Sequence, residues 1–471
     1  MNSTESEIVI VGGGPGGYAA AFYAADLGRK VTLIERDDRL GGVCMNRGCI
    51  PSKALLNATH GIVTARESAK RGISFGEPQI DVSKLRDWKN AILSKLAGGL
   101  KMLADKRGVQ VIHGRGYFEG SDRLRVETGS GQQFIRFQKA IIAVGSRPAL
   151  PKVFDLGNPR IMTSTEALEV DEIPGTLLVI GGGYIGMELG TVYATLGSQV
   201  TVVEALDSIL MGADADLARP VMLYAKKAFK ELRFKAKVTK MATAGKQIKV
   251  TTEFNGQTVE ELYDRVLVSV GRTPNSADMG IENTKAQLDD RGFIKVDGNQ
   301  QTDDQNIYAI GDISGGVLLA HKASKEARIA VEAILGEVHG AGKAVIPAVV
   351  FTDPEVAWCG LTESEAKEKG VEVEISKFPW GASGRAMTFD RVDGLTKLII
   401  EPGTDRILGV GIVGHGAGEL IGEGVVAVEM GATAKDLALI VHPHPTLSET
   451  LMEAAEAFYG HATHTLAARK K

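Results

Sequence analysis

Two stretches of the chain share one pattern of hydrophobic and polar positions. Residues 8–36 (IVIVGGGPGGYAAAFYAADLGRKVTLIER) and 177–205 (LLVIGGGYIGMELGTVYATLGSQVTVVEA) align at a constant offset of 169. Each begins with an aliphatic run, passes through a glycine-rich turn into small and apolar residues, and ends in a second aliphatic run followed by an acid. Short, fully apolar runs are typical of strands buried in a parallel sheet, and the stretch between them is long enough for a crossover helix. The repeat therefore predicts two βαβ units.

The pattern outside the repeat predicts both helices and strands. Spaced apolar positions among Lys, Glu, Leu and Ala over 66–106 predict helix, whereas alternation over 109–142 predicts strands and turns. Alternating runs at 246–254 and 261–270 and the apolar run at 307–310 predict further strands.

The last third of the chain contains both the alternating pattern of strands and the spacing of apolar residues that is typical of helices. Alternation at 348–351, 395–401 and 407–413 predicts a sheet, and the residues at 419–430 predict a helix beside it. Together with the repeat, this favours an α/β protein with two Rossmann-like dinucleotide-binding folds and a C-terminal α+β domain.

Turn-rich segments mark the expected domain boundaries, at Ala143–Pro148 and Gly271–Asn275. They divide the chain into 1–148, 149–275, a central segment 276–345, and 346–471. The basic residues at 467–471 are expected to fray.

Composition and charge narrow the function classes. At about 150 residues per domain, 471 residues predict roughly three domains. The 54 Lys and Arg against 58 Asp and Glu leave no basic surplus, which argues against nucleic acid as a partner. Neither a long apolar run nor a signal pattern is found, so we expect a cytoplasmic protein without membrane association. The three cysteines suit a reducing compartment.

The glycines of each repeat copy have the spacing of the dinucleotide fingerprint. A helix N-terminus after a tight glycine turn binds pyrophosphate, and an acid at the end of the second strand binds ribose hydroxyls. The alternative interpretation of this spacing is a tight turn between strand and helix that binds no ligand. Glu204, with no Arg after it, would repel a 2′-phosphate and favours NAD over NADP. The matching residues are Gly12, Gly14, Gly17 and Glu35 in the first copy and Gly181, Gly183, Gly186 and Glu204 in the second.

Only the first copy is followed by cysteines. Cys44 and Cys49 precede a Pro-Ser pair and apolar helix formers, so we expect both thiols at a helix start, which lowers a thiol pKa. They could instead be two buried small side chains or half of a zinc site, but zinc would need further ligands. A redox pair beside a dinucleotide site is the favoured interpretation.

The segment from Gly41 to Lys53 resembles the redox-active disulfide signature of the flavin-dependent pyridine nucleotide-disulfide oxidoreductases, and the residues at 50–53 are most similar to its dihydrolipoamide dehydrogenase branch. The resemblance implies FAD in the first fold, NAD in the second, and a C-terminal dimerisation domain. It implies that Cys49 contacts the flavin and Cys44 exchanges with the substrate. It also implies that Lys53 pairs with Glu188, although Glu188 on an otherwise apolar helix could instead be an ordinary surface acid.

Further cofactor contacts are implied by weaker matches. The run ending at Asp312 resembles the second FAD motif of the family, although Gly-Asp after an apolar strand is otherwise a common turn. Ala320 matches the start of the following helix. The remaining expected contacts are Gly116, Gly145, Ser146, Val238 and Gly271.

A histidine and an acid near the C-terminus complete the expected chemistry. Disulfide exchange needs a base for the thiol proton and a carboxylate to orient that base. His444 and Glu449 match the family's His-Pro-Thr-x-Ser-Glu motif, which is supplied by the second subunit of a homodimer. His442 could mimic a metal ligand beside them but is better interpreted as structural, and we predict no metal site.

The resemblance implies a substrate and a partner. The expected activity is oxidation of a protein-bound dihydrolipoyl group, carried by a lipoylated acyltransferase or by the H-type carrier of a glycine cleavage complex. No lipoyl domain precedes Ile8, so that group is expected in trans. A glutathione- or mercuric-reductase-like enzyme is the alternative of the same class, and a flavin-binding sensor or scaffold without turnover is the alternative of another class.

Three residues depart from the family pattern or lack a role in it. Arg47 stands where a small apolar residue is usual, and it either lowers the thiol pKa values or points to water. Pro443 replaces the more usual Ala and stiffens the approach to His444. Cys359 has no redox counterpart and is expected to be a packed thiol.

Overall fold

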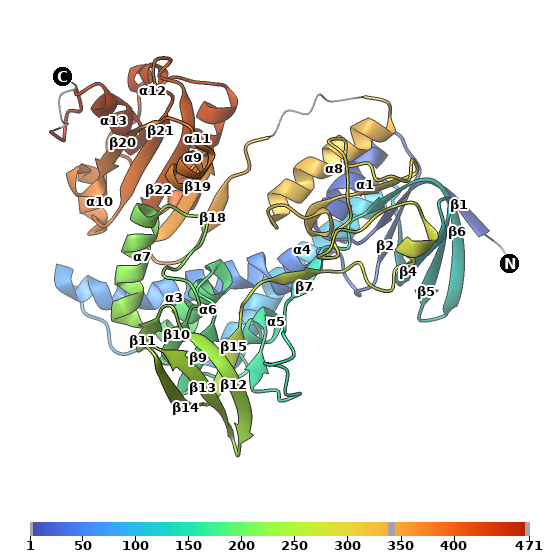
Figure 1. Ribbon diagram of the computed structural model, residues 1–471, viewed down its shortest axis with the longest axis horizontal. Helices are drawn as coiled ribbons and strands as arrows, with labels where there is room; N and C mark the ends of the chain where they lie inside the picture. The colour runs from blue at the N-terminus through green and yellow to red at the C-terminus, as the bar shows by residue number, and fades with distance from the viewer. Residues whose placement is uncertain (1–2, 338–343, 467–471) are drawn as a thin grey trace.

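The computed structural model describes residues 3–337 and 344–466, so the basic tail at 467–471 lies outside the described residues. The chain forms three regions, and each is built on its own main sheet (Figure 1).

The first glycine turn lies in a seven-stranded sheet. Its strands are β1 (Ser3–Val11), β2 (Val31–Glu35), β3 (Gln110–His113), β4 (Arg115–Gly120), β5 (Arg123–Thr128), β6 (Gly131–Ile142) and β17 (Ile307–Ala309). β1 pairs in parallel with β2 and β6, and β17 joins β6 in parallel from far along the chain. Helices α1 (Pro15–Asp26) and α8 (Ala320–Ile334) pack together over one face, where their alanines meet the apolar side chains of β1.

The second glycine turn lies in a five-stranded sheet of parallel pairs. Its strands are β8 (Ile161–Met162), β9 (Thr176–Ile180), β10 (Gln199–Val203), β11 (Glu231–Arg233) and β15 (Arg265–Val268), with helices α5 (Ser164–Ala167), α6 (Tyr184–Leu196) and α7 (Ala215–Ala228). A three-stranded antiparallel sheet covers it, formed by β12 (Lys237–Ala244), β13 (Gln247–Phe254) and β14 (Gln257–Tyr263). Two short strands, β7 (Ser146–Pro148) and β16 (Arg272–Pro274), pair where the chain crosses between the two sheets.

The C-terminal region is a five-stranded antiparallel sheet with helices around it. Its elements are β18 (Ala348–Val350), β19 (Glu355–Gly360), α9 (Glu363–Lys369), β20 (Glu374–Pro379), α10 (Gly384–Phe389), β21 (Leu395–Ile400), β22 (Ile407–Gly414), α11 (Ala417–Glu429), α12 (Ala434–Leu439) and α13 (Glu449–Phe458). The predicted fold class, two Rossmann-like folds and a C-terminal α+β domain, is confirmed.

The helical prediction for 66–106 was wrong in its middle. Helix α3 (Cys49–Ser68), which follows α2 (Gly42–Arg47), ends at the beginning of this stretch, and α4 (Val82–Lys106) fills its second part. Residues 73–81 between them are not helical. Gly72 has a left-handed φ of 84°, which ends the turn after α3. Asp81 then accepts a hydrogen bond from the Lys84 N–H and caps α4. Gly72 and Asp81 therefore interrupt the helix that the spacing of apolar residues predicted.

A single apolar core ties α3 to the other two regions. Leu55 of α3 is fully buried among the side chains of α6 and β9 and reaches the same cluster as Val356 and Val413 of the C-terminal sheet. The first turns of α3, which carry the second cysteine, are therefore held at the junction of all three regions.

Candidate active site

The first glycine turn has the geometry that phosphate binding requires. Gly12 has a φ of +107°, and a Cβ placed on Gly17 would lie 1.7 Å from the Gly12 carbonyl oxygen. The helix N-terminus at Gly14 is open, with no atom nearer than 3.8 Å to a Cβ placed there. Glu35 accepts a hydrogen bond from the Gly13 N–H at 2.8 Å, which joins the end of β2 to the turn. A side chain at Gly12 or Gly17 would not fit this turn, and its open N–H groups can receive an anion.

The second copy repeats the first in three dimensions. Gly181 has a φ of +106°, a Cβ on Gly186 would lie 2.1 Å from the Gly181 carbonyl oxygen, and Gly183 is open. Glu204 accepts the Gly182 N–H at 2.6 Å, as Glu35 accepts that of Gly13. The sequence repeat is thus a repeat of two equivalent binding turns.

The two cysteines meet from two different helices. The Sγ atoms of Cys44 and Cys49 are 2.7 Å apart. Cys44 lies within α2 and only Cys49 begins α3, so the expectation that both thiols share one helix start was wrong. The reason is Gly48, whose backbone angles fit neither helix and separate the two.

The two thiols differ in acidity. The hydrogen bond from Cys44, together with the nearby Lys53 ammonium, lowers the pKa of Cys49 to about 7 despite its burial. The same hydrogen bond, burial and the Cys49 charge raise the pKa of Cys44. The thiolate of the reduced pair is therefore carried by Cys49.

Lys53 and Glu188 form the pair that the family resemblance implies. The Lys53 Nζ lies 2.8 and 3.1 Å from the two carboxylate oxygens of Glu188, which is 3% exposed. Glu188 also accepts hydrogen bonds from the Ser52 hydroxyl at 2.7 Å and the Phe351 N–H at 3.0 Å. Both of its oxygens are satisfied, so Glu188 is not a surface acid.

Asp312 belongs to a polar cluster at the crossing of the two sheets. Ser146 donates to the Asp312 carboxylate at 2.5 Å, and the Arg272 Nε donates to the Ser146 hydroxyl at 2.7 Å. Arg272 was not predicted from the sequence. Its position next to Gly271 in the turn-rich boundary was the available signal, and it was interpreted only as a boundary.

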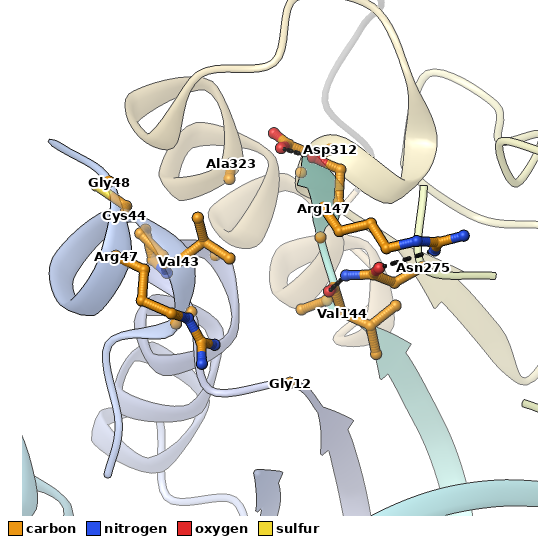
Figure 2. A pocket seen from close by; sticks show the side chains of 18 of the residues that line it. Gly12, Val43, Cys44, Arg47, Gly48, Val144, Arg147, Asn275, Asp312 and Ala323 are labelled. Atoms are coloured by element: carbon orange, nitrogen blue, oxygen red, sulfur yellow. Dashed lines mark hydrogen bonds between the residues drawn. The ribbon is translucent and has the colours of Figure 1, made fainter. Parts of the chain in front are cut away.

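One cavity brings most of these residues together (Figure 2). Cys44 and Arg47 stand on one side and Val144, Asn275 and Asp312 on the other. The predicted residues that line it are Gly12, Gly14, Glu35, Cys44, Cys49, Lys53, Gly116, Gly145, Ser146, Glu188, Asp312 and Ala320.

The remaining predicted cofactor residues lie elsewhere. Gly17 packs inside the first turn. Gly181, Gly183, Gly186 and Glu204 of the second turn are not among the residues that line this cavity, although Tyr184 and Ile185, which follow Gly183, do line it. The Val238 side chain is buried in the apolar core, so only its backbone in β12 could reach a ligand. Gly271 has a φ of +128° with open space beside it.

His444 and Glu449 form a hydrogen-bonded pair away from the cavity of their own chain. The His444 Nδ1 lies 2.8 Å from a Glu449 oxygen, and the other oxygen accepts the Thr446 N–H at 2.7 Å. Burial raises the pKa of Glu449, but these hydrogen bonds outweigh it and lower the pKa overall. The His444 side chain is 72% exposed, and His444 lies in the segment that joins α12 to α13 in the C-terminal region.

The C-terminal region that carries this pair also has large apolar side chains that are exposed. Val426, Met430, Leu439, Ile440 and Val441 are all exposed, Val441 by 93%. Such a patch is typical of a protein interface. His442, by contrast, is tied to Glu423 at 2.7 Å within its own chain, in keeping with a structural role.

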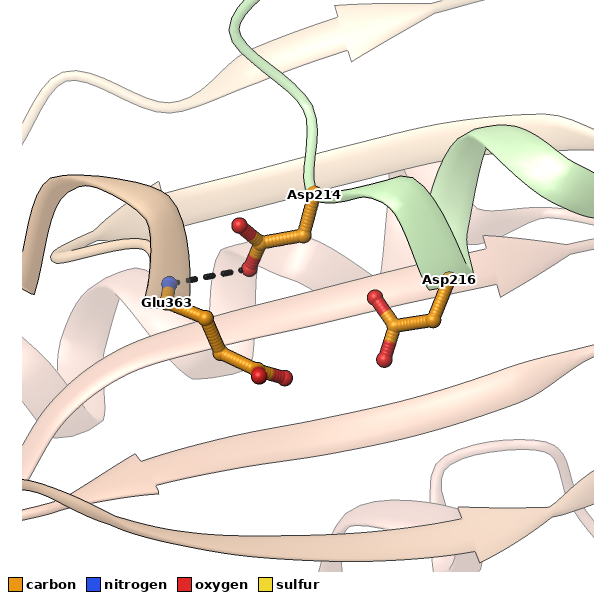
Figure 3. Close-up of side chains that lie close together, drawn as sticks. All are labelled: Asp214, Asp216 and Glu363. Carbon is orange, nitrogen blue, oxygen red and sulfur yellow. Dashed lines mark hydrogen bonds between the residues drawn. The ribbon is translucent and has the colours of Figure 1, made fainter. Parts of the chain in front are cut away.

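Among residues 3–337 and 344–466, one group of acids has metal-like spacing: Asp214, Asp216 and Glu363 (Figure 3). The Lys397 ammonium already occupies its centre, 2.7 to 2.9 Å from all three. Cys359 is 1% exposed in β19. Across the described helices, none has the length and apolar character needed to cross a membrane.

Comparison with known proteins places this arrangement in a family. The model of the pyridine nucleotide-disulphide oxidoreductases matches residues 6–327, and that of their dimerisation domain matches residues 346–455. The chain belongs to this family. It is 46% identical to a dihydrolipoyl dehydrogenase of Vibrio parahaemolyticus, over 98% of this chain and 97% of that protein.

Solved structures of similar proteins have the same fold as this chain. LpdA from Mycobacterium tuberculosis superimposes with a TM-score of 0.89 at 29% identity, covering 97% of this chain and 99% of that one. The flavoprotein disulfide reductase RclA from Escherichia coli, solved as a Cu(II) complex, does so with a TM-score of 0.86 at 28% identity and the same coverage.

The family uses FAD and NAD(H), and the lining of this cavity fits a dinucleotide such as FAD. Its glycine turn leaves N–H groups open that could receive a pyrophosphate, Glu35 lies beside that turn at the end of β2, and the Asp312 cluster offers further polar groups on the cavity wall. The second turn repeats the geometry of the first. The family match includes a dimerisation domain, residues 346–455, that contains the exposed apolar side chains and His444.

Proposed function

We propose that this protein is a dihydrolipoyl dehydrogenase, which oxidises a protein-bound dihydrolipoyl group and reduces NAD. The observation that carries the proposal is the pair of sulfurs 2.7 Å apart in a cavity walled by a dinucleotide-binding turn, in a chain 46% identical to a dihydrolipoyl dehydrogenase over nearly its whole length. The lipoyl group would be carried by the acyltransferase of a 2-oxo-acid dehydrogenase complex or by the H-type carrier of a glycine cleavage complex.

The reaction begins with proton removal by His444. His444 does not line the cavity of its own chain, and it lies in the matched dimerisation domain, which also carries exposed apolar side chains. We therefore place it at the cysteines of the second subunit. Glu449 holds the His444 Nδ1 and leaves the Nε2 free to take a thiol proton.

Disulfide exchange then transfers the electron pair. The lipoyl thiolate attacks Cys44 of the oxidised Cys44–Cys49 pair, the bond between the two cysteines breaks, and Cys49 leaves as a thiolate. The second lipoyl sulfur attacks the sulfur bonded to Cys44, which closes the lipoyl ring and releases Cys44 as a thiol. Its low pKa makes Cys49 the better leaving group. Bound FAD supplies the acceptor for the electron pair of Cys49 and the donor of a hydride to NAD.

Lys53 and Glu188 prepare the cavity for this chemistry. The Lys53 ammonium helps to lower the pKa of Cys49, and the buried Glu188 fixes the position of that ammonium. Because Glu204 would repel a 2′-phosphate, NAD is the proposed acceptor rather than NADP.

The test is NAD reduction by dihydrolipoamide, measured beside NADPH oxidation with glutathione disulfide on the same flavin-containing protein. Activity in the first assay alone supports the proposal. Activity only in the second would favour the glutathione-reductase-like alternative, and a flavin-containing protein inactive in both would favour the sensor or scaffold.

Variants test the assigned roles. Cys44→Ser should abolish turnover while FAD stays bound, and His444→Gln should lower turnover by about 10²- to 10⁴-fold, the usual contribution of a general base. Cys359→Ala is the matched control, because this buried thiol lies in the C-terminal sheet, and it should keep its turnover. Normal turnover in Cys44→Ser would contradict the mechanism.

A further inference from the structure

Arg47, the last residue of α2, takes no part in the proposed chemistry. Its guanidinium donates a hydrogen bond to the carboxylate of Asp37 and forms an ion pair with it. The strongest effects of other charged residues on the two thiols come from Lys53 and Glu188, not from Arg47. Arg47 and Asp37 both line the cofactor cavity, and their side chains are 32% and 26% exposed. The pair thus lies where the cavity meets solvent.

Asp37 is itself held by the phosphate-binding turn. Its N–H donates to one Glu35 oxygen at 2.9 Å, and the other Glu35 oxygen accepts the Gly13 N–H at 2.8 Å. Its carbonyl oxygen accepts a hydrogen bond from the His113 Nδ1 at 2.8 Å. Asp37 is therefore an anchored acceptor, and Arg47 is the group that reaches it. Figure 2 shows the Arg47 side chain extending from α2 towards the loop of Gly12.

The segment between the two charges forms a wall of the cavity. In its middle, the Gly41 N–H donates to the Gly13 carbonyl at 2.8 Å, and Gly42 packs so closely that a Cβ there would lie 2.6 Å from the Gly14 Cα. At the far end, Arg47 returns to Asp37. Buried Leu40, the hydrogen bond from the Asn46 amide to the Leu40 carbonyl and the packing of α2 against α3 also hold this wall, and the Arg47–Asp37 ion pair joins its two ends on the solvent side.

We propose that the Arg47–Asp37 ion pair is a latch that holds residues 37–47 closed over the dinucleotide in this cavity and slows its release. The inference rests on the proposed function, because it takes the occupant to be FAD. The latch acts on retention of the cofactor and leaves the acidity of the thiols unchanged.

The test measures the rate at which FAD leaves the purified holoenzyme, followed by the rise of flavin fluorescence after dilution. A partly exposed ion pair is worth up to about 1 kcal/mol, so Arg47→Ala and Asp37→Ala should each release FAD about threefold to fivefold faster at low salt. The double variant should be no faster than either single one, and the charge-exchanged variant Arg47→Asp with Asp37→Arg should recover slow release. The difference from the wild type should shrink as salt is added.

A matched control separates the latch from general loss of charge. Arg66→Ala removes an exposed ion pair with Glu77 outside the cavity and should leave the release rate unchanged. Equal rates in the wild type and both single variants, additive effects in the double variant, or a shifted Cys49 pKa without faster release would overturn the latch. A protein that binds flavin but fails with dihydrolipoamide would contradict the proposed function and leave the latch standing.

Discussion

Replacing Lys397 with Met should destabilise the junction between the second sheet and the C-terminal region. Lys397 is fully buried on β21, and its ammonium contacts Asp214, Asp216 and Glu363 at 2.7, 2.8 and 2.9 Å. Asp214 also accepts the first N–H groups of α9, both at 3.0 Å, so the cluster joins the start of α7 to α9. Methionine fills the space of the stem but leaves three acids with one remaining cation, Lys377.

The expected loss is about 3–5 kcal/mol at pH 7, the range for removing one partner of a buried ion pair. The loss should depend on pH. In the wild type, burial raises the pKa values of Asp214 and Asp216, but the lysines outweigh this and lower them. Their stabilisation is therefore present above the unfolded pKa of about 3.9 and is lost as the pH falls through the lower folded values. Without Lys397, burial dominates and the acids destabilise the variant at neutral pH.

The assay is urea unfolding at fixed protein concentration, at several pH values between 5 and 8. The deficit of Lys397→Met should be largest at pH 8 and narrow as the acids take up protons. Lys101→Met is the control, because Lys101 is 73% exposed in its pair with Asp105 and should cost at most about 0.5 kcal/mol. A Lys397→Met protein within about 1 kcal/mol of the wild type at pH 7 would refute the reasoning.

Three further outcomes are expected. Gly17→Ala should purify without FAD, because the new Cβ would lie 1.7 Å from a backbone oxygen. Gly61→Ala should retain FAD, because a Cβ at that position meets no atom within 4 Å. The flavin absorbance of the two purified proteins tests this prediction. Alkylation of the reduced protein should rise with pH to half its maximal rate near pH 7, the pKa of Cys49, and a midpoint near 9 would contradict the assignment of the thiolate. Glu449→Gln should lower turnover by at least about tenfold while leaving FAD bound, and because the pKa of Glu449 is lowered, the wild-type pH profile above pH 5 should show no step from this group.

Much of the site could be predicted because its parts are local in sequence. The glycine turns, the two cysteines and the His444–Glu449 pair each lie within a short stretch, where spacing alone determines which atoms can meet. The repeat at an offset of 169 likewise predicts two equivalent turns, and the structure has them with matching φ values at Gly12 and Gly181. The geometry of such a turn depends on the backbone angles that its own residues allow, and these can be inferred from the sequence of the turn itself.

Other features depend on which segments pack together, and the sequence alone does not specify that. Glu188 meets Lys53 from 135 residues away, and the Phe351 N–H reaches it from 163 residues away. Arg272 approaches Ser146, and Lys397 settles among acids of α7 and α9, only after three sheets have docked. The sequence by itself determined the chemistry of the site, since motif residues carry it. The tertiary structure decided the partners of each charge, because buried charges must be paired by whatever side chains the packing of distant segments brings to them.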